Sequence, residues 1–231
     1  MSWISPAEWT AILLTLRVAV IATLLATPFG VALAWLLARR NFWGKSVLDA
    51  LVHLPLVLPP VVTGYLLLLT LGRRGAVGTW LADHLGIVFA FRWTGAALAC
   101  GVMAFPLLVR PIRLSIEAID RRLEQAASTL GAAPWQVFAT VTLPLALPGI
   151  LAGMVLGFAK AIGEFGATIT FVSNIPGETQ TISSAIYSLI QTPDGDTAAL
   201  RLVVISVVIA LAALIASEWF ARRATKRLHG N

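Results

Sequence analysis

Five long apolar runs alternate with short polar segments along the chain. Three runs carry no Asp, Glu, Lys or Arg over 21 to 23 residues. Each therefore meets the roughly 20 residues that a helix needs to cross about 30 Å of hydrocarbon. Two other runs have 16 and 17 residues, and interfacial side chains such as Trp93 and Trp219 would help them reach the membrane surface. The pattern predicts an all-α membrane protein with about five transmembrane helices, at residues 18–38, 50–72, 93–109, 137–159 and 202–217.

The segment 165–193 is the candidate for a sixth span. Its first apolar part, 165–172, is too short to cross a bilayer. In its second part, 179–193, apolar residues form a stripe on one side, with Ser and Thr opposite. Such a one-sided stripe favours an interfacial or re-entrant helix, and a sixth span is the alternative.

The first residues predict a short helix outside the membrane rather than a cleaved signal peptide. Ser5-Pro6-Ala7-Glu8 fits a capping box with proline at the first helical position. No Lys or Arg precedes Arg17, whereas a signal peptide begins with a basic segment. We expect Trp3 and Trp9 to hold this helix at the interface; a frayed N-terminus is the alternative.

A polar helix–turn–helix pattern interrupts the apolar runs at 124–144. Gly131 stands where a left-handed residue would end one helix, and Pro134 where the next would begin. An apolar stripe crosses this segment, with charged and polar residues opposite. Its members are Ile116, Ile119, Leu123, Ala126, Ala127 and Leu130. A polar segment between two spans predicts a docking site for a protein outside the membrane; a plain amphipathic connector is the alternative.

Composition supports the membrane prediction independently. Hydrophobic residues make up 58% of the chain and charged residues 12%, about half the charged share of a soluble domain. The 231 residues are expected to form one membrane domain, residues 1–231. The net charge of +6 comes from basic residues at the ends of apolar runs, which argues for membrane topology and against nucleic-acid binding. The single cysteine, Cys100, excludes an internal disulfide framework.

The basic residues also predict the orientation. With five spans, 11 of the 17 Lys and Arg residues fall in the loops after the first and third spans and in the C-terminal tail. The other 6 fall on the opposite side. By the positive-inside rule the 116–142 loop and the C-terminus are cytoplasmic, and the N-terminus is outside the cell membrane.

The sequence offers no catalytic set. Gly44-Lys45-Ser46 resembles the end of a phosphate-binding loop, but Arg39 occupies the place of the first glycine. The histidines, His53, His84 and His229, have no metal-ligand spacing. We expect no enzyme activity, no metal and no cofactor in this chain, so that ATP and magnesium, if used, are bound by a partner. An ion-coupled secondary transporter is the rival class, with Glu164 embedded in the membrane; Lys160 could simply pair with it.

Three glycines on the fourth predicted span point to close helix packing. Gly149, Gly153 and Gly157 repeat at every fourth residue, which permits two helix backbones to approach. The stripe fits a sliding or dimer-facing surface, or static packing. Pro55, Pro59 and Pro60 are expected to break up the start of the second span.

The 124–144 spacing resembles the EAA loop of ABC importer permeases. The matching residues are Gln125, Ala126, Ala127, Gly131, Val141, Leu143 and Pro144. Gln125 stands in the glutamate position of that motif, and the carboxylate lies one residue earlier, at Glu124. On the polar face, Glu124 and Gln125 are expected to tolerate conservative change better than Gly131.

Further stretches are similar to those of molybdate ABC-transporter permeases. They are 53–65 (HLPLVLPPVVTGY), 72–75 (GRRG), 163–174 (GEFGATITFVSN) and 175–179 (IPGET). The Gly-Glu-Phe-Gly element also occurs in sulfate permeases, so a sulfate-type permease is the alternative. The resemblance implies the type I importer fold with a cytoplasmic coupling helix. It also implies a homodimer, two cytoplasmic ATPase subunits, and an external protein that delivers molybdate or tungstate.

A tetrahedral dianion needs a polar path, because it cannot enter hydrocarbon unaided. Passage requires weak contacts rather than several fixed cations. Hydroxyl and amide groups offer donors without net charge. The candidate path or gate residues are Thr168, Thr170, Ser173 and Asn174. Glu164 is a poor ligand for an anion and is expected to hold the gate region in place. For the four uncharged residues, the alternative to a path or gate is that they cap a helix end at the outer surface.

Overall fold

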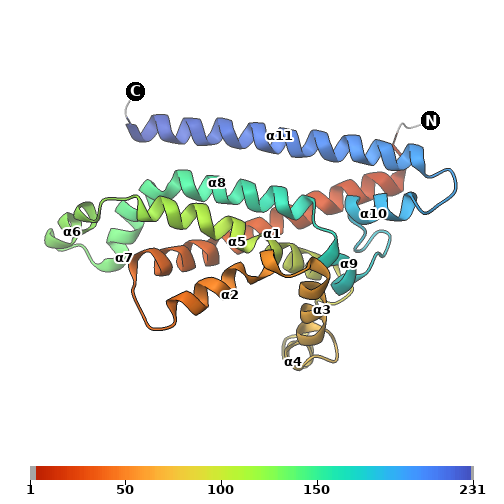
Figure 1. Cartoon of the computed structure of the whole chain (residues 1–231), viewed down its shortest axis with the longest axis horizontal. Helices are drawn as coiled ribbons and strands as arrows, with labels where there is room; N and C mark the ends of the chain where they lie inside the picture. Colours follow the sequence, from red (N-terminus) through yellow and green to blue (C-terminus); the bar gives the residue numbers. More distant parts are fainter. Residues whose placement is uncertain (1–3, 230–231) are drawn as a thin grey trace.

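Helices of very different length make up the protein, and the long ones lie roughly side by side (Figure 1). The computed structural model describes residues 4–229, with side chains up to residue 216. The order is α1 (Pro6–Arg39), α2 (Lys45–Val57), α3 (Pro60–Leu71), α4 (Ala76–Leu85), α5 (Trp93–Glu117), α6 (Arg121–Thr129), α7 (Pro134–Val137), a π-helical segment (Phe138–Thr142), α8 (Leu143–Ile162), α9 (Gly166–Val172), α10 (Ile182–Leu189) and α11 (Asp196–His229). Trp3, and the side chain of Trp219, lie outside the described part.

Four helices of the described chain are long and apolar enough to cross a membrane. They contain the predicted first, third, fourth and fifth spans. The second predicted span is not straight: α2 and α3 pass the same test together but are bent by 114° between Val57 and Pro60. Pro55 lies inside α2 and does not break it. Counting the bent pair as one span gives the expected total of five.

The segment 165–193 does not span in the described structure. It forms α9 and α10, of 7 and 8 residues, which at about 1.5 Å per residue are too short to cross hydrocarbon. α9 packs against α3 and α5, and α10 against α11 and α1. The expectation of short, non-spanning helices is confirmed.

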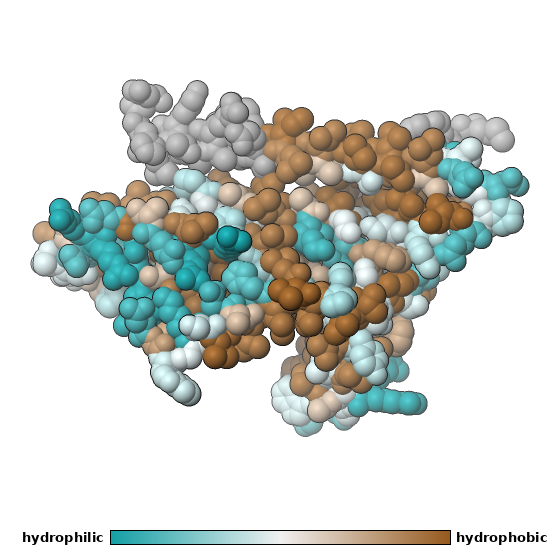
Figure 2. Space-filling view, viewed as in Figure 1, coloured by the Kyte–Doolittle hydropathy of each residue, from teal (hydrophilic) through white to brown (hydrophobic). Residues whose placement is uncertain are grey.

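The core is built around α5, which packs against α1 and α8. Small side chains dominate this contact, with Ala96, Ala99 and Cys100 almost completely buried. Apolar residues cover the middle of the molecule along its long axis, and hydrophilic ones gather toward both ends (Figure 2). The bundle therefore has an apolar middle with polar ends, as a membrane requires.

One end of the bundle is held by α1. Ser5 and Glu8 form the predicted capping box, but the helix that they begin is not short, because it continues for 34 residues. Glu8 Oε1 accepts from Arg201 of α11 at 2.9 and 3.1 Å. Thr15 Oγ1 accepts from the first amide of α10, Ile182 N, at 2.8 Å. Thus α10 and α11 are both fixed to the first turns of α1.

Candidate functional site

The α6–α7 turn at the other end of the bundle has the geometry that its sequence predicts. Asp120 caps α6 by accepting from Arg122 N at 2.9 Å. After Leu130, Gly131 has φ +88°. Its amide donates to Ser128 O and that of Ala132 to Ala127 O, at 3.0 and 3.2 Å. These bonds form a Schellman motif, in which the left-handed residue satisfies the last carbonyls of the helix.

The path from this turn into the long helix α8 is irregular. Pro134 begins α7, and Gln136 Oε1 accepts from Ala133 N at 2.7 Å. A five-residue π-helical segment then leads into α8, whose first turn contains Leu143 and Pro144. π-helical turns occur mostly as local bulges, frequently at functional sites.

Glu124 connects three elements at this point. Its Oε1 accepts from Thr142 Oγ1 at 2.6 Å, at the end of the π-helical segment. Its carboxylate also pairs with Arg39 Nε, at 3.1 Å to Oε2. Arg39 Nη2 donates further to Ile119 O at 3.2 Å. The end of α1, the start of α6 and the start of α8 are therefore joined through one carboxylate.

The expectation that Glu124 makes a surface contact is wrong. Its side chain is 18% exposed and that of Arg39 is 8% exposed, so little water is at hand to replace either partner. Gln125, by contrast, is exposed as expected. Removing one partner of a largely buried ion pair leaves the other charge uncompensated. The carboxylate therefore belongs to the structure of the loop.

The apolar stripe of this segment leaves the core within one turn. Ile116 and Ile119 are buried, at 0% and 8% exposure, but Leu123 is 50% and Leu130 89% exposed. The reason is the break between α5 and α6, which reorients the stripe. Trp135 is also 70% exposed. Leu123, Leu130 and Trp135 are thus three exposed apolar side chains, here termed the loop patch, on an otherwise polar segment.

A cleft of about 510 Å³ lies between the end of α1 and the α6–α7 segment. Arg39, Arg40 and Arg121 contribute to its wall. So do Trp35 and Phe138, whose rings contact edge to face at 5.9 Å. This cleft is more polar than a second cavity, which lies between α1, α2 and α5.

The neighbouring helix α2 is tied to the same end of the bundle. Arg113 of α5 donates to Asp49 of α2 at 2.9 Å and to Glu117 at 2.8 Å. The sequence did not predict these ion pairs of Arg39 and Arg113. Their only signal in the sequence is their position near the end of an apolar run, and many solvated basic residues have the same position.

At the opposite end, Glu164 is buried between α8 and α9. Its Oε2 accepts from Lys160 Nζ at 2.7 Å, and its Oε1 from Ala167 N at 3.0 Å in the first turn of α9. The side chain is 1% exposed. Glu164 thus connects α8 to α9, and the predicted pairing with Lys160 is confirmed; that it holds a gate region in place stays a prediction.

The uncharged candidates for a path occupy different environments. Thr168 is buried and donates to Phe165 O at 2.9 Å; Thr170 donates to Gly166 O at 2.8 Å. Both hydroxyl protons are therefore used within the helix. Ser173 is exposed, with φ +64°, at the end of α9. Asn174 donates to Ser188 Oγ at 2.6 Å, and its Oδ1 is buried without a partner.

The glycine stripe of α8 faces α5 of the same chain. A Cβ on Gly153 would lie 2.6 Å from Leu108 O, and one on Gly149 2.3 Å from Ser115 Cβ. At Gly157 the nearest atom would be at 3.6 Å. The stripe therefore serves close packing inside the chain, and the dimer-facing alternative is wrong.

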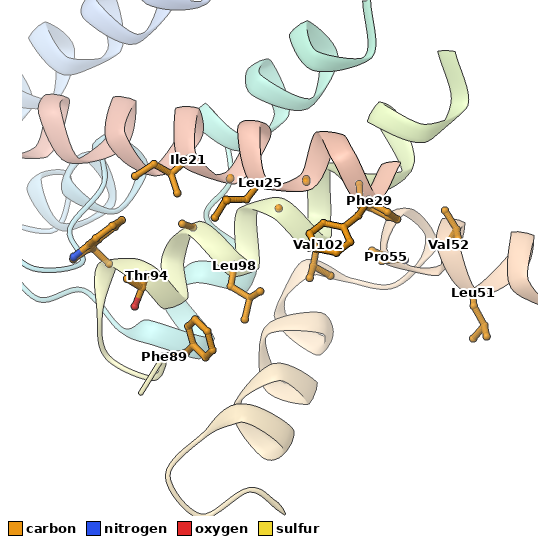
Figure 3. Close-up of a pocket in the computed structure, with 16 residues that line it drawn as sticks. Ile21, Leu25, Phe29, Leu51, Val52, Pro55, Phe89, Thr94, Leu98 and Val102 are labelled. Atoms are coloured by element: carbon orange, nitrogen blue, oxygen red, sulfur yellow. The ribbon is translucent and has the colours of Figure 1, made fainter. Parts of the chain in front are cut away.

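A hollow of about 750 Å³ lies between α1, α2 and α5. Figure 3 shows Leu25, Phe29 and Leu98 among the side chains around it. Its wall is almost entirely apolar, and Thr168, Thr170, Ser173 and Asn174 are not part of it. Thr94 and Trp93 are the polar side chains in its wall, too few donors to compensate a dianion, so this hollow is not the expected polar path.

Long apolar helices around a small-residue core, with a structured polar loop between two of them, indicate a multi-pass membrane protein. The chain belongs to the family of binding-protein-dependent transport system inner membrane components, which matches residues 26–226. It is 60% identical over 220 residues to the molybdenum transport system permease protein ModB of Escherichia coli K12, covering 95% of this chain and 96% of the relative. A probable sulfate transport system permease protein of Nephroselmis olivacea is 35% identical over 215 residues, covering 93% and 75%.

The fold agrees with that assignment. A bacterial ABC transporter that imports the acidic polysaccharide alginate superposes with a TM-score of 0.75, at 22% identity, covering 95% of this chain and 80% of the other. The predicted type I importer permease fold is confirmed.

Proposed function

We propose that this chain is the membrane subunit of an ATP-driven importer for molybdate, or the similar tetrahedral anion tungstate. The identity of the anion rests on the 60% sequence identity to a molybdenum permease over nearly the full length of both chains. The sulfate alternative is less well supported, because the sulfate relative shares 35%. Membership of a binding-protein-dependent family argues against the ion-coupled carrier and for an external protein that delivers the anion.

The loop patch supports a cytoplasmic ATPase as partner. Leu123, Leu130 and Trp135 expose apolar surface at the end of the bundle where the positive-inside rule places the cytoplasm. Exposed apolar groups rimmed by polar residues are typical of protein interfaces. We propose that each of two ATPase subunits, which bind ATP and magnesium, docks on this patch. The N-terminus is then outside, and the C-terminus inside.

The polar path is proposed to form between two copies of the chain. The apolar hollow within one chain offers a dianion few donors, from Thr94 and Trp93. A path lined by Ser173 and Asn174 would need a second wall, which a second copy supplies. Glu164 keeps α9 in place beside it.

Uptake of labelled molybdate into proteoliposomes tests the proposal. The permease is reconstituted with its ATPase, with the binding protein outside and ATP inside. We expect uptake that requires both proteins and that continues when the proton gradient is dissipated at constant ATP. Competition by sulfate at equal concentration distinguishes the anions. Uptake that stops with an uncoupler, or that needs no ATPase, contradicts the proposal.

A further inference from the structure

The cleft between the end of α1 and the α6–α7 segment carries more positive charge than its surroundings balance. Arg39, Arg40 and Arg121 lie in its wall, with Glu124 as the one carboxylate. Glu124 is engaged with Arg39. Among the residues that the structure describes, no carboxylate pairs with Arg40 or Arg121. Asp120, next in sequence to Arg121, is not in the wall, and its Oδ1 accepts from Arg122 N.

The remaining polar groups in the wall offer two further donors, the amide of Gln125 and the indole N–H of Trp35. Ser128 and Thr129 donate their hydroxyl protons to Glu124 O and Ala126 O, at 2.9 and 2.8 Å. The amide of Gln125, in contrast, has no hydrogen bond to another described residue. Two guanidinium groups, one amide and one indole N–H therefore belong to residues that line a volume of about 510 Å³, within the usual range of ligand pockets. This donor set suits an oxyanion of the phosphate class.

The aromatic residues place the cleft at the membrane surface. Trp35 lies in the last turns of α1, and the guanidinium of Arg40 sits 5.8 Å from its ring centre. Trp35 and Phe138 form an apolar side to the cleft. Tryptophan and arginine at the end of a span mark the headgroup level of a bilayer. Basic pockets between helices on the cytoplasmic side are suited to anionic lipid headgroups.

We propose that this cleft binds the phosphate of an anionic phospholipid from the cytoplasmic leaflet. Arg40 and Arg121 pair with the phosphate, Gln125 donates to it, and the glycerol backbone lies against Trp35 and Phe138. The inference rests on the orientation given under Proposed function. It adds a ligand to the loop: the lipid would connect α1 to α6 beside the Arg39–Glu124 pair.

The test compares lipid binding by the full chain purified in detergent. Phosphatidylglycerol and phosphatidylcholine are titrated, and bound lipid is measured by native mass spectrometry. At roughly fivefold per arginine near an anionic surface, we expect phosphatidylglycerol to be preferred about 25-fold. Arg40→Gln/Arg121→Gln should abolish the preference. The matched control is Arg110→Gln/Arg122→Gln, which removes the same charge from exposed positions outside the cleft and should keep it.

Three results would overturn the proposal. One is an equal preference in the two double variants, which would assign the effect to net charge. Another is full competition by millimolar inorganic phosphate, which would assign the cleft to a soluble anion. The third is loss of ATPase co-purification in the cleft variant with an unchanged lipid preference, which would make it a protein contact. Lipid binding is read without transport, so failure here is distinguishable from failure of the proposed importer.

Discussion

Replacing Glu124 with alanine should loosen the whole α6–α7 segment. The carboxylate accepts from Thr142 at 2.6 Å and pairs with Arg39 at 3.1 Å. Breaking a fully buried pair by removing one partner costs about 3–5 kcal/mol. Because Glu124 is 18% exposed, we expect a smaller loss, about 2 kcal/mol in the free energy of local opening, which corresponds to a roughly 30-fold change in the opening equilibrium.

Hydrogen exchange measures this opening directly. The amides of Gly131, Ala132 and Val137 are hydrogen-bonded within the loop and exchange when it opens. In Glu124→Ala, peptides that cover 126–138 should exchange roughly 30-fold faster. Thr142→Val removes one hydrogen bond, worth about 1 kcal/mol, and should give a change of about fivefold.

Gln125→Ala is the matched control, because Gln125 is the exposed neighbour of Glu124 on the same helix. It should exchange at the wild-type rate. Equal rates in Glu124→Ala and Gln125→Ala would refute the reasoning, since the pair would then contribute nothing to the loop. Arg39→Met/Glu124→Leu provides a second check: with both charges removed, part of the protection should return.

Three further changes test other features. Gly131→Val places a β-branched residue at φ +88°, where the backbone strain costs about 1–3 kcal/mol. This variant should reach the membrane in normal amounts but no longer co-purify with the ATPase. Gly131→Asn should still co-purify with it, because asparagine tolerates this conformation. Gly153→Leu adds a side chain whose Cβ would lie 2.6 Å from Leu108 O, so this variant should have an apparent Tm lower by several degrees and reduced uptake. In Gly157→Ala the nearest atom to the new Cβ would be at 3.6 Å, so this variant should resemble wild type. Equal Tm values in the two variants would contradict the packing. Cysteines introduced at Thr79 and Ser128, both exposed, should react with impermeant reagents from outside and from the cytoplasm respectively, over a silent background from buried Cys100; labelling from one side would overturn the orientation.

The sequence predicted best those features that depend on local rules. Gly131 and Pro134 define the turn because only backbone conformation is at issue, and Glu164 pairs with Lys160 because they are one helical turn apart. Hydropathy located the spans because a bilayer demands a minimum apolar length. The prolines predicted a break in the second span, and the structure has it between Val57 and Pro60. The sequence did not show which proline marks it, since Pro55 and Pro59 look alike in sequence, yet only the second lies at a helix end.

Contacts between distant segments were missed for a different reason. Arg39 and Glu124 are 85 positions apart, and nothing in a single sequence pairs them. The same holds for Arg113 and Asp49, which are 64 apart. The exposure of Leu123 and Leu130 was also not foreseen, because a helical stripe continues in sequence even when the helix itself has turned away from the core.

α1 is fixed at both ends by side-chain contacts that include a partly buried ion pair. Near its start, Glu8 holds Arg201 of α11 and Thr15 holds the first amide of α10; at its end, Arg39 holds Glu124 of α6. Its 34 residues span about 50 Å at 1.5 Å per residue. We therefore expect an axial displacement of α1 at its α6 end to displace α10 at the opposite end of the bundle as well. Pro28 is the one interior position of this helix where a missing amide permits it to flex.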